Sequence, residues 1–286
     1  MDEAECGGTG RAVILSRSDV PAAQRLVIKV GSSSLTRPDG HLDLGAVNRL
    51  TRTIAGARSR GQEIVLVSSG AQAAAMGPLG LKCKPRTLSG AHAAASVGLG
   101  LLIAEYTRQF ADLGHIVGQV LLTAEDVLRR TNYKNARRAL DTLLSMGVIP
   151  IVNENDTVAT DEIRFGDNDK LAALTAHLVH ADALVLLTDV DALYDKNPRL
   201  PDAARIPTIH SFSEAESLDV GTRGTAFGTG GMITKIQAAA MSMSSGVPVL
   251  LTSAQKADAA LAGEVVGTWL EATASRLPAR QLWLAY

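Results

Sequence analysis

Lys29 is the first residue whose surroundings suggest chemistry. It interrupts an apolar run, Leu26 to Val30, and is followed by Gly31 and by three serines at 32–34. A lysine in such a run is costly unless its ammonium group reaches water or an anion. The glycine and the serines allow backbone and hydroxyl donors to approach a phosphate closely. Lys29 is therefore a candidate anion ligand; the alternative is a lysine that snorkels from a strand end into water.

A second candidate phosphate site is glycine-rich. The stretch 228–235 reads Gly-Thr-Gly-Gly-Met-Ile-Thr-Lys and leads into a helical pattern. Glycines ahead of a helix N-terminus present backbone N–H groups to a phosphate, and Lys235 adds a cation one turn into the helix. The stretch is not a Walker A loop, because it lacks the GK[ST] ending.

Carboxylate and carboxamide side chains cluster in two short segments. They occupy 153–156 (Asn-Glu-Asn-Asp) and 167–169 (Asp-Asn-Asp). Asparagine can bind both the amine and the carboxylates of an amino acid, and aspartate can bind an ammonium group or orient a lysine. The alternative is a solvated loop in which Asp167 or Asn168 caps the next helix.

Two further loops contain small or acidic residues. Ser68-Ser69-Gly70 leads into a helix and could offer N–H groups to a carboxylate, although this is also ordinary turn chemistry. Thr188 and Asp189 follow another apolar run, where they form a turn or hold the base and ribose of a nucleotide.

The elements that position these loops alternate along the chain. Apolar runs predict strands, and periodic segments predict helices, the first of them capped by Asp43. The predicted strands are 26–30, 64–67, 116–122, 148–152, 183–187 and 247–251. The first predicted helix follows its cap at residue 43, and four further helices are predicted at 88–110, 131–146, 168–179 and 231–244.

This order predicts an α/β fold: a three-layer αβα sandwich whose central sheet is mostly parallel. Ligands bind at the carboxyl ends of the strands in such folds, where all the candidate loops lie. We expect one continuous domain over 25–286, preceded by an N-terminal tail over 1–24.

The composition narrows the class of protein. The 286 residues are 46% hydrophobic but only 3% aromatic, which suits an aliphatic core. The net charge of −1 gives no electrostatic support to a nucleic-acid partner. No apolar run reaches the roughly 18 residues of a membrane span, and Cys6 and Cys83 suggest neither a disulfide framework nor a metal cluster. We expect a cytoplasmic protein.

Together these segments resemble the amino acid kinase family, and most closely its glutamate 5-kinase members, over roughly 26–286. The segments that carry the resemblance are 27–31 (VIKVG), 67–71 (VSSGA), 151–156 (IVNEND), 162–169 (EIRFGDND) and 228–232 (GTGGM) with Lys235. The members often carry a further C-terminal PUA-like domain, and this sequence stops at Tyr286, where the kinase domain would end.

The resemblance implies a function, and it assigns roles. It implies ATP-dependent phosphorylation of the γ-carboxylate of L-glutamate, the first step of proline synthesis. It also implies Mg²⁺ bound mainly through the ATP phosphates, a homo-oligomer, inhibition by proline, and transient contact with a downstream reductase. The implied catalytic residues are Lys29, Asp169 and Lys235; the substrate-binding residues are Ser69, Gly70, Asp156 and Asn168; and the ATP-binding residues are Gly31, Thr188, Asp189, Thr229, Gly230, Gly231, Met232, Ile233, Thr234 and Lys235.

The chemistry agrees with those roles. A side-chain carboxylate, with an ordinary pKa of about 4.3, is already ionised at neutral pH and needs no general base. Catalysis must align two anions and neutralise their repulsion. We therefore interpret Asp169 as an orienting group rather than a proton acceptor.

The long helix departs from the family pattern. Ala91, His92 and Leu99 stand where the family usually has a lysine and two glutamines. Two alternatives follow: a kinase of the same fold that acts on a glutamate analogue, and a non-catalytic sensor of an amino acid or nucleotide. The retention of Lys29, Asp169 and Lys235 favours an enzyme.

Overall fold

The computed structural model describes residues 13–85, 87–123, 126, 129–156, 168–197, 200–216 and 231–273. The strands are β1 (Arg25–Val30), β2 (Glu63–Ser68), β3 (Val117–Leu122), β4 (Ile149–Glu154), β5 (Ala183–Thr188), β6 (Leu193–Tyr194), β7 (Arg205–Ile206), β8 (Thr208–Ile209), β9 (Val249–Ser253) and β10 (Thr268–Leu270). The helices are α1 (Leu44–Ser59), α2 (Ala71–Met76), α3 (Leu88–Asp112), α5 (Arg130–Ser145), α6 (Asn168–Leu178), α7 (Phe212–Glu216), α8 (Met232–Ser244) and α9 (Ala257–Leu261), with 3₁₀ turns η1 (Arg17–Ala22), η2 (Ser32–Leu35) and η3 (Ala254–Lys256).

The central sheet has the strand order β3-β4-β2-β1-β5-β9-β10-β8. The pairs from β3 to β9 are all parallel, and β10 then runs antiparallel to β9. Val30, the last residue of β1, pairs with Ser68 of β2 and with Leu187 of β5. The parallel pairing and this register bring the carboxyl ends of the central strands to one edge of the sheet, as the sequence predicted.

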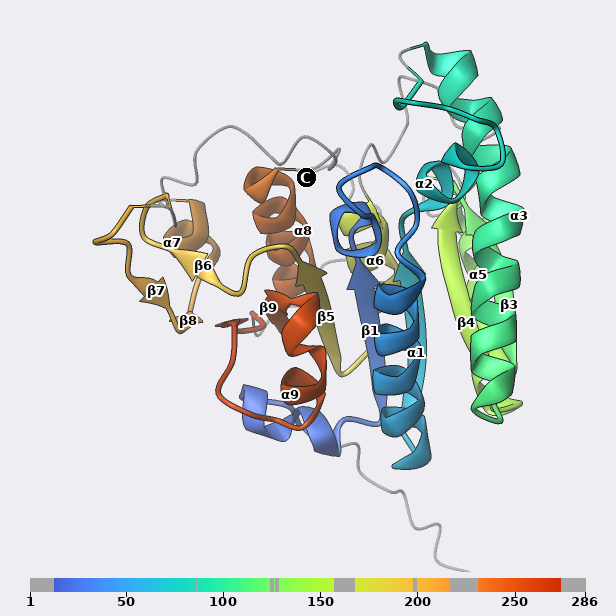
Figure 1. The fold of residues 1–286 in the computed structure, drawn as a ribbon. Helices are drawn as coiled ribbons and strands as arrows, with labels where there is room; N and C mark the ends of the chain where they lie inside the picture. The colour runs from blue at the N-terminus through green and yellow to red at the C-terminus, as the bar shows by residue number, and fades with distance from the viewer. Residues whose placement is uncertain are drawn as a thin grey trace, which may run out of the picture.

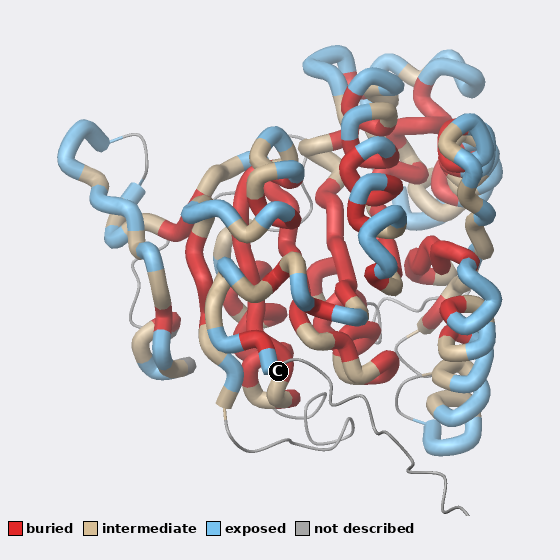
Figure 2. The backbone as a smooth tube through the Cα atoms, turned by 90° about the horizontal axis from the view of Figure 1, so that it is seen from below, coloured by how far each residue is buried: buried red, intermediate tan, exposed pale blue. Residues whose placement is uncertain are grey.

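Helices cover both faces of the sheet, which confirms the three-layer αβα class (Figure 1). One core cluster joins the sheet to α5, α6 and α8, and the other joins it to α1, α3 and α9. The buried segments lie along the strands and the inner sides of the helices, while the outer turns of the helices are exposed (Figure 2). Alternate residues of each strand face opposite layers.

The residues before β1 take part in this core. Val20 in η1 and Ala23 are buried in the cluster that contains α1 and α9, together with Ile14. The buried side chain of Gln62 donates two hydrogen bonds, to the carbonyl oxygens of Val20 and Ala23. Three residues of the expected tail are therefore packed against the core. Their packing could not be predicted, because single apolar side chains between polar ones give no periodic signal.

Helix α3 is long and unusually apolar. By length and composition alone it could cross a membrane, with a mean hydropathy of 1.3 over its most apolar window. In the structure it is a layer helix: Leu102, Tyr106 and Phe110 are buried against the sheet and α1, while Val97 and Leu101 are exposed. The sequence contains no uninterrupted apolar run of about 18 residues, because glycines, serines and alanines separate the large apolar residues of this helix.

Candidate active site

Lys29, Asp169 and Lys235 meet in one buried cluster. The Lys29 Nζ lies 2.5 Å from Oδ1 of Asp169, and the Lys235 Nζ lies 3.1 Å from Oδ2 of the same carboxylate. The side chains of Lys29 and Asp169 are 2% and 1% exposed, and that of Lys235 is 10% exposed. The three charged residues singled out from the sequence thus form one ion-paired group.

The fold explains how three distant residues converge. Val27 of β1 faces the layer that contains α6 and α8, and Lys29, two residues later, faces the same way. Asp169 lies in the first turn of α6 and Lys235 in the first turn of α8, and these helices pack against each other over that face. Strand alternation and two helix starts therefore place the ammonium groups on either side of one carboxylate.

This cluster carries a net positive charge. Two ammonium groups and one carboxylate sum to +1, in a region with almost no exposure to water. Buried charges are tolerated only when they are paired, and two ammonium groups beside one carboxylate suit a site that binds an anion. A Cβ atom added to Gly31 would lie 3.6 Å from the Lys29 Nζ, so the absence of a side chain there leaves space next to this ammonium group.

Asn168, the neighbour of Asp169, joins the ends of two strands. Its Nδ2 donates to the carbonyl oxygen of Ser68 at 3.0 Å, to Oγ of Ser69 at 3.1 Å and to Oδ1 of Asn153 at 2.9 Å. Asn153 Oδ1 also accepts from the backbone N–H of Glu154. The Asn168 amide thus holds the carboxyl ends of β2 and β4 together beside the charged cluster.

Gly70 is required by the backbone at this edge. It precedes α2 with a φ of +108°, a conformation that L-residues with side chains rarely adopt. This turn directs the chain from Ser69 into α2. Asp156, two residues after β4, is partly buried in the neighbouring turn.

The residues assigned to the nucleotide lie on the other side of Lys29. The Gly31 N–H donates to the carbonyl oxygen of Leu187 at 3.3 Å, which fixes the end of β1 against the end of β5. Buried Thr188 ends β5, and its hydroxyl donates to Oδ1 of exposed Asp189 at 2.9 Å.

Gly231 precedes α8, and Met232, Ile233 and Thr234 form its first turn ahead of Lys235. Thr234 Oγ1 donates to the carbonyl oxygen of Gly231 at 2.8 Å. Thr229 and Gly230, assigned to the same loop, lie outside the described residues. The roles given to all these residues stay predictions.

Asn153 and Ser68 belong to the site, although the sequence analysis named them only as members of motifs. Asn153 is 5% exposed and Ser68 is 1% exposed, so both are buried polar groups at strand ends. Their position in strand-end motifs was a usable signal, because a buried amide must find hydrogen-bond partners. The partner, Asn168, could be identified only in three dimensions.

The described residues hold no group of three or more histidine, cysteine, aspartate or glutamate side chains that could bind a metal ion. Both oxygens of Asp169 contact lysines. In phosphoryl-transfer sites Mg²⁺ usually keeps several waters and is bound by substrate phosphates together with one or two protein carboxylates.

Comparison with known proteins agrees with the geometry. A model described as the amino acid kinase family matches residues 24–253. A protein from Thermobifida fusca named glutamate 5-kinase is 54% identical over 281 residues, covering 97% of this chain and 72% of that protein. A protein of the same name from Streptomyces coelicolor is also 54% identical, over 95% of this chain and 73% of its own length.

Among solved structures, carbamate kinase from Giardia lamblia bound to AMP-PNP is similar, with a TM-score of 0.66. The match covers 88% of this chain and 100% of the solved chain at 18% sequence identity, which shows a shared fold only. The matched family model and the high identity to the curated relatives show that the chain belongs to the amino acid kinase family and, within it, to the glutamate 5-kinases.

Proposed function

We propose that the chain transfers the γ-phosphoryl group of ATP to the γ-carboxylate of L-glutamate and forms glutamyl 5-phosphate, the first step of proline synthesis. The observation that carries this proposal is the contact of Lys29 and Lys235 with opposite oxygens of Asp169, at the carboxyl edge of a parallel sheet. The names of the curated relatives support glutamate as the acceptor and a kinase reaction.

The reaction requires one bond to form and one to break. A glutamate carboxylate oxygen attacks the γ-phosphorus, and the bond from that phosphorus to the bridging oxygen breaks to release ADP. The acceptor is ionised at neutral pH, so no residue removes a proton. The two ammonium groups offset the charge of the transferring phosphoryl group, and Asp169 holds them at a fixed separation.

Ser69 and Asn168 bind the acceptor in this proposal, with Asp156 alongside. Ser69 Oγ accepts a hydrogen bond from Asn168, so its own proton can donate to a carboxylate. The Asn168 nitrogen is occupied by Ser68, Ser69 and Asn153, which leaves its Oδ1 to accept from an ammonium group. The pair therefore suits a ligand that carries both an anionic and a cationic group, as an amino acid does.

ATP binds across the ends of β1 and β5 and the start of α8. Its phosphates lie against Gly31, Lys29 and the 229–235 loop, and its base and ribose lie near Thr188 and Asp189. Mg²⁺ accompanies the phosphates, where it supplies additional charge neutralisation. The space beside Gly31 and the helix start at Gly231 support this placement.

The exposed apolar residues of α3 support self-association of the chain. Exposed Val97 and Leu101 lie four residues apart on α3, on the same side of a helix that is largely apolar. Burial of that strip against a second copy of the chain would remove it from water. Feedback inhibition by proline, contact with a downstream reductase and a cytoplasmic location follow from the same family assignment and are part of the proposal.

An acceptor panel tests this function. The chain is incubated with ATP, Mg²⁺ and hydroxylamine, with L-glutamate, N-acetylglutamate, hydroxylated glutamates or aspartate as the acceptor, with and without proline. We expect hydroxamate and ADP in equal amounts with L-glutamate. Hydroxamate with an analogue but none with glutamate would replace the acceptor, and amino-acid binding without ADP release would favour the sensor.

A further inference from the structure

Tyr106 on α3 contacts Ser68 at the carboxyl end of β2, next to the residues that we assign to the acceptor. Its side chain is 0% exposed, and its ring stacks on that of Phe110 with the ring centres 6.3 Å apart. The phenol oxygen lies 2.8 Å from Oγ of Ser68, at the carboxyl end of β2. A buried hydroxyl that reaches a strand end is thus present on the layer opposite the lysine cluster.

The direction of this hydrogen bond follows from proton counting. Ser68 Oγ donates its single proton to the carbonyl oxygen of Ser69 at 3.0 Å. Both contacts can be hydrogen bonds at once only when the phenol proton lies between Tyr106 and Ser68, with Ser68 Oγ as the acceptor. Burial raises the pKa of Tyr106, so the phenol remains a donor across the physiological range of pH.

The chain of donors ends on the residue that we assign to the acceptor. Tyr106 donates to Ser68, and Ser68 donates to the Ser69 carbonyl oxygen. The Ser69 N–H donates to the carbonyl oxygen of Val30, and Asn168 donates to the Ser68 carbonyl oxygen and to Ser69 Oγ. The Ser68–Ser69 peptide is therefore held from α3 on one side and from α6 on the other.

Packing alone does not fix these side chains. A small cavity lies between α3 and the sheet, lined by Ser68, Asn153 and Tyr106 and by apolar residues that include Leu99 and Leu102. Side chains that border a void have contacts missing on that side, so they can shift. The hydrogen bond with Tyr106 is a directional restraint on the Ser68 side chain in this region.

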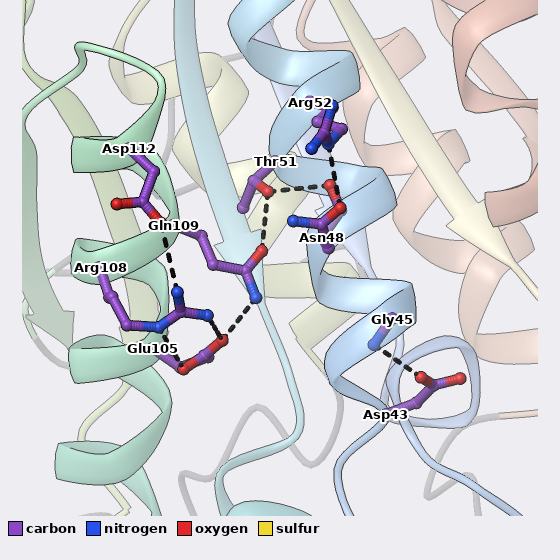
Figure 3. A network of polar contacts seen from close by, with 9 residues as sticks. All are labelled: Asp43, Gly45, Asn48, Thr51, Arg52, Glu105, Arg108, Gln109 and Asp112. Carbon is purple, nitrogen blue, oxygen red and sulfur yellow. Dashed lines mark hydrogen bonds and ion pairs between the residues drawn. The ribbon is translucent and has the colours of Figure 1, made fainter.

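Helix α3 is itself anchored where it carries Tyr106. Buried Gln109 accepts from Thr51 Oγ1 of α1 at 3.0 Å and donates to Glu105, which also pairs with Arg108 (Figure 3). This network ties the turn that contains Tyr106 to the neighbouring helix. The phenol oxygen is therefore held by a rigid element.

We propose that Tyr106 is a positioning residue for the phosphoryl acceptor, which orients the Ser69 hydroxyl through Ser68. The assignment rests on the proposed function of Ser69 in binding the acceptor. It predicts that loss of the phenol hydroxyl weakens acceptor binding and leaves ATP binding intact, because the donors lead to the β2 end and not to the nucleotide loops.

Tyr106→Phe tests this proposal, since it removes one oxygen and keeps the ring. We expect the KM for glutamate to rise about twofold to tenfold, the usual effect of one buried hydrogen bond, with the KM for ATP unchanged. Tyr133→Phe is the matched control: it removes a phenol hydroxyl from half-buried Tyr133 on α5, on the other face of the sheet, and should change neither constant. A Tyr106→Phe enzyme with an unchanged KM for glutamate, or with both constants raised alike, would overturn the proposal.

Ser68→Ala provides a second change, which removes the hydroxyl group that contacts Tyr106. If the two residues act in one chain, the Ser68→Ala/Tyr106→Phe double variant should have nearly the same KM for glutamate as Ser68→Ala alone. Effects that multiply would show that Tyr106 does not act through Ser68 and would overturn the proposal. Thermal unfolding of each variant checks that it is folded at the temperature of the kinetic assay.

Hydrogen exchange separates the failure of this proposal from the failure of the proposed function. In the ligand-free chain, Tyr106→Phe should speed exchange of the Ser69 amide, and Tyr133→Phe should not. Wild-type turnover with glutamate tests the function. If turnover fails but exchange at Ser69 responds, the acceptor assignment is wrong and the relay remains; exchange unchanged from that of the wild type would overturn the relay itself.

Discussion

Asn168 and Asp169 are consecutive residues at the start of α6, and their side chains serve opposite halves of the site. The Asn168 amide reaches the ends of β2 and β4, whereas the Asp169 carboxylate reaches two lysines from β1 and α8. One helix start thereby sets the residues that we assign to the acceptor against the charged cluster. A rigid connection of this kind is what an in-line transfer between two bound anions requires.

Asp169→Asn is expected to disable the enzyme. The amide would remove the negative charge that both buried ammonium groups contact, so kcat should fall about 10²- to 10³-fold, and the free energy of unfolding should fall by about 3–5 kcal/mol. Steady-state kinetics and urea denaturation measure the two effects. Asp258→Asn, an exposed change on α9, should alter neither quantity.

Lys235→Ala is expected to act on the chemical step. Its ammonium group contacts Asp169 at the start of α8, and loss of one preorganised charge should lower kcat about 10²- to 10³-fold at saturating ATP. Lys82→Ala, at an exposed loop position, is the control. Near-normal kcat at saturating ATP in the Lys235 variant would show that this lysine does not assist the transfer.

Asn168→Asp should be worse than Asn168→Ala for the binding of glutamate. Three acceptor oxygens, from Ser68, Ser69 and Asn153, converge on the Asn168 nitrogen, and a carboxylate oxygen would repel them. We expect the KM for glutamate to rise at least about tenfold in the aspartate variant. The reverse order of the two variants would mean that Asn168 does not hold these strand ends through its nitrogen.

Gly98 and Gly100 give a matched pair in α3. A Cβ at Gly98 would lie 1.6 Å from the carbonyl oxygen of Ala71, whereas a Cβ at Gly100 meets nothing within 4 Å. Gly98→Ala should therefore lower the free energy of unfolding by at least about 2 kcal/mol, and Gly100→Ala should raise it by about 0.5–1 kcal/mol. Urea denaturation measures both. Equal stabilities would contradict the close contact of α2 and α3.

Much of the architecture could be predicted from periodicity. The apolar runs and the helical patterns marked the six long parallel strands and five of the helices within about two residues, and Asp43 caps α1 as expected. Short elements were missed, among them β8 and the antiparallel β10, because a few residues carry no period.

The candidate site was predictable to a different degree in its two halves. Lys29 and Lys235 were visible as charges in apolar or glycine-rich surroundings, and Asp169 was visible as a member of a cluster of carboxylates and carboxamides. The structure brings the three together. The hydrogen bonds from Asn168 to Asn153 and Ser68 were not visible in the sequence, because partners distant in sequence are set by the register of neighbouring strands. The role of Tyr106 was not visible either, because this residue has the spacing of an ordinary core residue of α3.

The most direct test of carboxylate phosphorylation follows an oxygen atom. L-Glutamate labelled with ¹⁸O in its γ-carboxylate is incubated with the chain, ATP, Mg²⁺ and hydroxylamine, and the released inorganic phosphate is analysed by mass spectrometry. If the carboxylate attacks the γ-phosphorus, hydroxylamine then displaces phosphate that carries one ¹⁸O atom from glutamate. Unlabelled phosphate, released as ADP forms, would mean that water attacks ATP, and it would contradict transfer to the carboxylate.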